Sequence, residues 1–172
     1  MDTVRTVIDS PLVLGPPLAL YLVVVLALHR RWTALGTLYR LAAGVYVAGV
    51  LHFTLFPIEW NHSVYRSRNP WYNGISPIPL LTADLSGFVL NVVMMVPLGV
   101  FAALLRRTPL TIKQITLVGL AASAVVEITQ VVLYAIFDSG RSADVNDLIA
   151  NTLGCVLGYL ATTRVLRRAT VA

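Results

Sequence analysis

The sequence contains one cysteine and little charge. Because Cys155 is the only cysteine among 172 residues, the chain can form neither an intrachain disulfide nor a cysteine-based metal site. Charged residues make up 12% of the chain, about half the share of a typical soluble domain. The chain also lacks a phosphate-binding glycine loop, a histidine-rich metal motif and a nucleophile motif. Hydrophobic residues make up 57% of the chain, and so much apolar surface has to face lipid.

The basic residues do not suggest a nucleic-acid-binding surface. The formal net charge is +5 and the isoelectric point is about 9.8, values that alone would suit a nucleic-acid partner. The 13 basic residues, however, stand in twos and threes at the ends of apolar segments and do not gather on one face. We therefore expect no nucleic-acid partner and interpret these residues as determinants of membrane topology.

Five apolar segments are long enough to cross a bilayer, which takes about 20 residues. They are Pro11–Leu28, Leu38–Pro57, Leu85–Leu105, Ile112–Phe137 and Val145–Thr163. The sequence thus predicts an all-α, polytopic transmembrane helix bundle of about five helices, formed by residues 1–172 as a single domain. Pro16 and Pro17 interrupt the first segment, so a four-span arrangement with a re-entrant first segment is the alternative. The residues before it lack the features of a cleaved signal peptide, and we expect the first helix to be retained.

The basic residues also predict an orientation. Nine of the 13 fall around the first and third connections and the C-terminus: Arg30, Arg31, Arg40, Arg106, Arg107, Lys113, Arg164, Arg167 and Arg168. Because basic residues accumulate in cytoplasmic connections, the N-terminus is predicted outside and the C-terminus inside. Residues 58–84 would then form an extracytoplasmic loop.

That long loop is rich in aromatic residues and prolines. It contains Trp60, Tyr65, Trp71, Tyr72, Pro70, Pro77 and Pro79. Such a composition suits an aromatic belt at the bilayer surface with prolines that order the chain. It equally suits a lid that rests over a site, and the sequence leaves both interpretations open.

Polar residues form one stripe on each of the last two predicted helices. At about 100° per residue, Asp144, Asp147 and Asn151 share one face of the fifth helix, as Glu127 and Gln130 do on the fourth. Gly154 and Gly158 continue the first stripe; Ser123, Tyr134 and Phe137 belong to the second. The glycine pair is itself typical of close helix packing.

The short connection between these helices predicts that they are antiparallel neighbours. Counting about 1.5 Å per residue from Phe137 and from Asp144 places Tyr134 level with Asp147, Gln130 with Asn151, and Glu127 with Gly154. The two stripes would then line a polar cleft that opens outward.

Three further polar residues are predicted to lie near this cleft. Asn91 falls about two turns from the outer end of the third helix, and His52 about one turn from that of the second. Arg141 is the predicted countercharge of Asp144 and Asp147. Ionisable residues within membrane spans are costly and mark functional sites by default.

These residues occur in an order that resembles a known family. The matching elements are Phe53-Thr54-Leu55-Phe56-Pro57, Asn91 followed by Pro97-Leu98-Gly99, Glu127-Ile128-Thr129-Gln130, and Arg141, Asp144, Asp147, Asn151, Gly154 and Gly158. In this order the chain resembles the VanZ-like family of bacterial membrane proteins. The resemblance implies a small polytopic protein of the cell envelope that is linked to glycopeptide (teicoplanin) resistance, and it implies no particular reaction.

Two functions suit the predicted cleft. In the first, Arg141, Gln130, Asn151 and Asn91 hold the polar headgroup of a membrane lipid, a cell-wall precursor lipid or a lipoglycopeptide, and Glu127 is a proton or cation site. In the second, Asp144, Asp147 and Glu127 bind a divalent cation through oxygen, as in a metal-assisted hydrolase or transferase acting on a lipid phosphate. His52 or Glu127 would then be the general base.

We rank the binding function first because the chain carries no motif for a catalytic nucleophile and two carboxylates in a first helical turn can simply cap the helix. A self-satisfied structural network is the remaining alternative. No cofactor other than the divalent cation of the second hypothesis is expected.

Overall fold

The structure, a computed structural model, describes residues 5–61, 70–78, 84–106, 108–137 and 142–171. Its five helices are α1 (Ser10–Ala27), α2 (Ala34–Leu55), α3 (Leu85–Leu105), α4 (Ile112–Phe137) and α5 (Val145–Val171), with short 3-10 turns η1 (His29–Arg31) and η2 (Trp71–Gly74). Each helix is long and apolar enough to span a membrane. The prediction of an all-α, five-helix bundle is therefore confirmed.

The helix bounds follow the sequence closely, with two informative differences. The helix α1 continues through Pro16 and Pro17, so the four-span alternative is wrong. The helix α5 extends eight residues beyond the predicted Thr163, because basic residues near its end are good helix formers although they ended the apolar segment. The bounds of α3 and α4 are those predicted.

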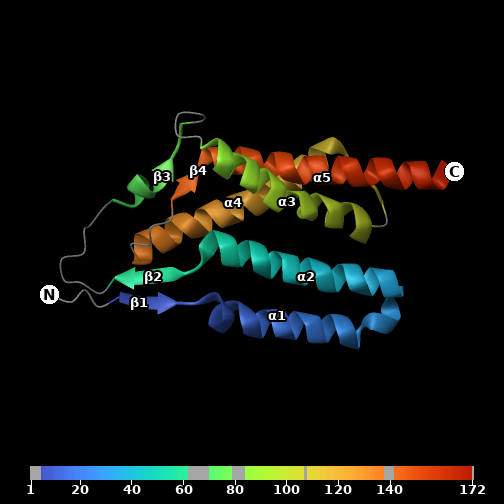
Figure 1. The fold of residues 1–172 in the computed structure, drawn as a ribbon, viewed down its shortest axis with the longest axis horizontal. Helices are drawn as coiled ribbons and strands as arrows, with labels where there is room; N and C mark the ends of the chain where they lie inside the picture. The colour runs from blue at the N-terminus through green and yellow to red at the C-terminus, as the bar shows by residue number, and fades with distance from the viewer. Residues whose placement is uncertain (1–4, 62–69, 79–83, 107, 138–141, 172) are drawn as a thin grey trace.

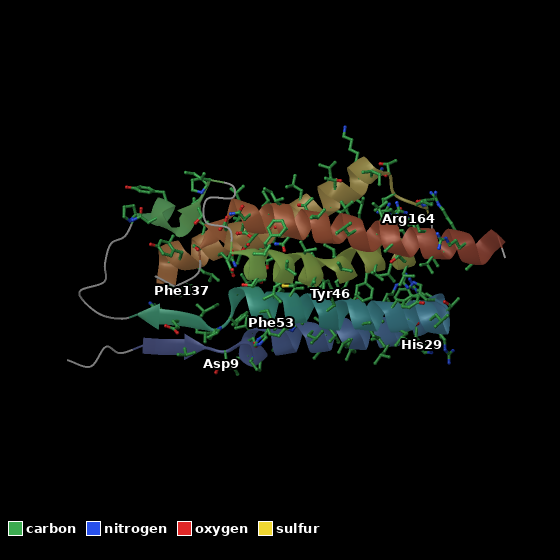
Figure 2. The ribbon with its side chains drawn as sticks, turned by 45° about the horizontal axis from the view of Figure 1, so that its top comes forward. Asp9, His29, Tyr46, Phe53, Phe137 and Arg164 are labelled. Carbon is green, nitrogen blue, oxygen red and sulfur yellow. The ribbon has the colours of Figure 1, made fainter. Side chains whose placement is uncertain are left out.

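Four short strands, which the sequence pattern did not predict, gather at one end of the bundle (Figure 1). They are β1 (Arg5–Ile8), β2 (Ile58–Asn61), β3 (Ile75–Ser76) and β4 (Ala143–Asp144). The antiparallel pair β1–β2 ties the N-terminal residues to the chain after α2, and the parallel pair β3–β4 places Ser76 opposite Asp144. We call this the strand end. We call the opposite end, with η1, the α3–α4 connection and the last turns of α5, the basic end. Figure 2 shows Asp9 and Phe137 at the strand end and His29 and Arg164 at the basic end.

The closest helix contact joins α3 and α5. A Cβ at Gly154 would collide with the Val92 carbonyl oxygen, and one at Gly158 with the Val96 carbonyl oxygen. From the other side, a Cβ at Gly99 would collide with the Cys155 carbonyl oxygen. The glycines let the two backbones touch, so the close packing predicted for Gly154 and Gly158 is confirmed.

The helix α4 also packs against α5, as predicted. Its first turn is a capping box: Gln114 Oε1 accepts from the Thr111 backbone N–H at 2.9 Å, and Thr111 Oγ1 accepts from the Gln114 N–H at 3.3 Å. Deeper in the contact, Ile115 and Cys155 are fully buried. The helices α3, α4 and α5 thus form a packed unit, beside which the α1–α2 hairpin lies (Figure 1).

Candidate functional site

Polar side chains of α3, α4 and α5 meet near the strand end. The central contact joins α4 to the start of α5: Glu127 Oε2 accepts a hydrogen bond from the Asp144 backbone N–H at 3.0 Å. Glu127 is only 9% exposed, so its carboxyl group lies inside the bundle. We call the residues that gather here the polar cluster: Asn91, Ser123, Glu127, Gln130, Asp144, Asp147 and Asn151.

Asp144 caps α5. Its Oδ1 accepts from the backbone N–H of Asn146 at 2.8 Å and from the Asn146 side chain at 2.9 Å. Asn146, which sequence reasoning missed, is 3% exposed. The signal was present, because an Asp two residues before an Asn at a helix start is a common capping arrangement. The expectation that an acid here caps the helix is confirmed for Asp144.

Asp147 has a different role from a capping residue. In a capping box the acid at the third helical position would bond back to the N–H of the capping residue. Here Glu127 of another helix accepts from that N–H, and the Asp147 carboxyl lies near the Asn91 side chain of α3. The three carboxyls lie close enough to one another to interact electrostatically. The polar cluster therefore concentrates acceptor oxygens.

One turn deeper, Asn151 joins α5 to α4. Its Nδ2 donates to Ser123 Oγ at 2.9 Å, and both side chains are buried, with exposures of 2% and 0%. The Asn151 amide oxygen, Oδ1, has no hydrogen-bond partner within the described parts of the chain. A buried amide oxygen of this kind can accept a hydrogen bond from a donor.

Gln130 joins α4 to the end of α2. Its Nε2 donates to the Thr54 carbonyl oxygen at 3.1 Å, a carbonyl that belongs to the last turn of α2. This bond links the Phe53–Pro57 segment to the Glu-x-x-Gln segment of α4. Gln130 is 7% exposed, and its Oε1 is the second buried side-chain oxygen that lacks a partner among the described residues.

The structure corrects the predicted register of α4 against α5. Glu127 meets Asp144 rather than Gly154, and Asn151 meets Ser123 rather than Gln130. Phe137 therefore lies well past the start of α5, because it is ten residues, or about 15 Å, beyond Glu127. The extra turns of α4 pack on strand-end elements: Phe137 contacts Trp60 edge-on with ring centroids 5.3 Å apart, and Tyr134 lies against Gly74.

This shift has a consequence for depth. Glu127 lies level with Asp144, the residue just before α5, and not level with the middle of α5. Gly154 faces Val92 of α3 and does not face Glu127. The count from helix ends went wrong because it assumed that α4 and α5 end at the same level.

His52 lies apart from the polar cluster. Its Nδ1 is 2.6 Å from the Ser10 hydroxyl at the start of α1, and its ring contacts Phe53 edge-on. This contact joins α1 to α2. Arg141, the predicted countercharge, lies outside the described residues.

The polar cluster does not form a chelating set. Across the described ranges, no group of three or more His, Cys, Asp or Glu side chains is arranged to hold a metal ion. The divalent cation expected at Asp144, Asp147 and Glu127 gains no support from this geometry, and neither does the metal-assisted hydrolase or transferase.

A cavity of about 230 Å³ lies between α2, α3 and α4. Its walls include Val50, Met95, Val126 and Tyr46, whose hydroxyl donates to the Met94 carbonyl oxygen at 2.9 Å. Val126 adjoins Glu127, and the Val50 carbonyl oxygen accepts from the Thr54 hydroxyl at 2.8 Å. An apolar cavity thus lies beside the polar cluster.

The comparisons with known proteins give one match. The family model described as VanZ/LLP1 matches residues 16–167, a range that includes every residue of the polar cluster. Searches of curated proteins and of solved structures give no significant match.

Proposed function

Because this chain belongs to the VanZ/LLP1 family and carries five helices fit to span a membrane, we propose that it is a protein of the bacterial cytoplasmic membrane that supports resistance to glycopeptides such as teicoplanin. It does so by binding a lipid or cell-wall-precursor headgroup at the polar cluster. The proposal is one of binding rather than catalysis.

The observation that carries this proposal is the pair of buried oxygens without partners, Gln130 Oε1 and Asn151 Oδ1. A buried acceptor that lacks a donor costs about 1–3 kcal/mol. Buried polar groups are almost always satisfied by protein groups or by ordered water, so each of these oxygens calls for a donor. A ligand that supplies two donors would remove this cost.

The charge of the polar cluster narrows the class of headgroup. Glu127, Asp144 and Asp147 offer carboxylate oxygens within interaction distance of one another. Together with the two amide oxygens, they suit a group rich in hydrogen-bond donors: hydroxyls, amide N–H groups or an ammonium. The sugar and peptide portions of a cell-wall precursor, or of a lipoglycopeptide, carry such donors.

The apolar cavity beside Val126 suits the other half of such a ligand. Its volume is about 230 Å³, and its walls are hydrophobic side chains of three helices. A headgroup at the polar cluster and an apolar chain in this cavity would together match an amphipathic molecule. On the other side, β3 pairs with β4 beside Asp144, so Ile75 and Ser76 would border the headgroup.

Resistance of a bacterial host tests the proposal. In cells that depend on this protein for teicoplanin tolerance, Glu127→Gln and Asp147→Asn should each lower the tolerated concentration severalfold while protein levels in the membrane stay unchanged. Both replacements keep the side-chain shape and remove the charge. Glu59→Gln is the matched control, because Glu59 lies in β2 outside the polar cluster, and it should retain full tolerance.

The contrary result is equally clear. Should the Glu127→Gln and Asp147→Asn proteins accumulate normally and give the same tolerance as the wild type and Glu59→Gln, the polar cluster would be a structural network and the proposed function would be wrong.

A further inference from the structure

The segments at the basic end hold an excess of basic over acidic residues. The segments 28–33, 106–111 and 164–171 contain seven arginines and one histidine, but none of the eight acidic residues. In the described structure, these segments form η1, the connection between α3 and α4, and the last turns of α5. Such a concentration of basic side chains attracts anionic groups.

A cavity at this end gathers two of these arginines. It has a volume of about 220 Å³ and lies between the end of α3, the α3–α4 connection and α5. Its polar walls come from Arg106, Thr108, Thr163 and Arg167, and its apolar walls include Ala102 and Leu166. Two guanidinium groups and hydroxyls thus border one small space.

The walls of this cavity are held by side-chain contacts. The Tyr159 hydroxyl accepts from the Leu110 backbone N–H at 2.6 Å and donates to the Leu110 carbonyl oxygen at 2.9 Å. These two hydrogen bonds hold the α3–α4 connection against α5. Because Tyr159 is 3% exposed, this tether is shielded from water.

The chemistry of the walls selects one type of ligand. Guanidinium groups bind phosphate oxygens through paired N–H donors, and a threonine hydroxyl can add a further bond. Apolar surface continues from the cavity along α5, where Val165 is 66% and Leu166 is 44% exposed. A free phosphate ion would use only the arginines, whereas a phospholipid would also cover this apolar surface with its glycerol and chains.

We propose that this cavity, the basic-end cavity, binds the phosphate of an anionic phospholipid such as phosphatidylglycerol. The site is separate from the polar cluster, since the two lie at opposite ends of the bundle. It anchors α3 and α5 at the membrane surface, and it does so in the leaflet that the basic residues predict to be cytoplasmic. Anionic lipids are attracted to such juxtamembrane arginines.

Lipid titration of the purified protein tests the site. In detergent, added dioleoyl-phosphatidylglycerol should raise the melting temperature well above the effect of dioleoyl-phosphatidylcholine. The double variant Arg106→Gln/Arg167→Gln should bind phosphatidylglycerol about 30-fold more weakly, which follows from the loss of two arginine–lipid contacts. Arg30→Gln/Arg31→Gln is the matched control, because it removes the same charge at the same end but lies outside the cavity, and it should bind as the wild type does.

Several outcomes would refute the proposed lipid site. Equal weakening in the Arg30→Gln/Arg31→Gln control would show diffuse attraction to charge. Inorganic phosphate that stabilises the wild type as much as phosphatidylglycerol does would show a free-anion site. Where the double variant fails to fold, native mass spectrometry of the wild type decides: equal retention of phosphatidylglycerol and phosphatidylcholine would refute the proposal.

Discussion

Glu127 shows what can and cannot be learned from a residue in isolation. Its presence in an apolar segment, three residues before Gln130, predicts that it belongs to a functional site. Its partner could not be identified, because that partner is a backbone N–H of Asp144 at the end of another element. Residue type indicates chemistry, whereas the contact depends on how far two helices slide past each other. The same limit explains why the unpartnered oxygens of Gln130 and Asn151 could not be foreseen.

Replacing Glu127 separates its acceptor role from its charge. Glu127→Leu removes the acceptor of the Asp144 N–H and should lower the free energy of unfolding by about 1–3 kcal/mol. Glu127→Gln keeps an oxygen at the same place, so it should cost much less. Thermal unfolding in detergent measures the difference, and equal losses in both variants would show that the bond to Asp144 does not stabilise the fold.

Asp84 at the start of α3 gives a pH prediction. The Ser86 hydroxyl, followed by the Gly87 and Ser86 backbone N–H groups, bonds to its carboxylate and holds the pKa below the ordinary 3.8. A lowered pKa means that the carboxylate stabilises the folded state above pH 3.8 and that this contribution is lost as the pH falls through the lowered pKa. Wild type should therefore melt higher than Asp84→Asn at neutral pH, and the gap should close in acid; a gap that stays constant down to pH 2 would contradict this.

At the scale of elements, the helices were predictable and their register was not. Apolar length fixed α3 and α4, and the small residues predicted close packing. The glycines of α5 nevertheless contact α3 and not α4. Because they lack a side chain, the backbone of α5 can touch the backbone of α3 at Val92 and Val96. The strands were missed for a related reason: they are two to four residues long and depend on partners distant in the sequence.

Alanine at Gly158 tests the α3–α5 contact. Its Cβ would collide with the Val96 carbonyl oxygen, and backbone cannot move aside as a side chain can. We expect Gly158→Ala to destabilise the protein by about 1–3 kcal/mol, as overpacking does. Gly49→Ala in α2 is the control, since a Cβ there meets nothing within 4 Å, and it should be neutral or slightly stabilising because alanine favours helix. Equal melting temperatures for both variants would contradict this packing.

At the scale of the whole molecule, polarity is divided between the two ends. The polar cluster and the four strands lie toward one end, and the arginines of η1 and of the last turns of α5 lie at the other (Figure 2). The sequence predicted this division from the placement of its basic residues. It could not predict that the strand end is tied together by β1–β2 and β3–β4.

The predicted orientation can be measured by labelling intact cells with a membrane-impermeant maleimide. Cys155, the sole cysteine, is buried and should not react, so the wild type serves as the blank. Asn73→Cys in η2 should label on intact cells, whereas His29→Cys in η1 should label only after the membrane is opened. The opposite pattern would mean that the basic end faces outward.

The most direct test of the proposed headgroup site is a density map of the protein in native lipid. The account predicts non-protein density beside the polar cluster, within hydrogen-bond distance of Gln130 Oε1 and Asn151 Oδ1, with a chain continuing into the cavity beside Val126. A map in which both oxygens are bonded to protein groups, with no density between them, would contradict it.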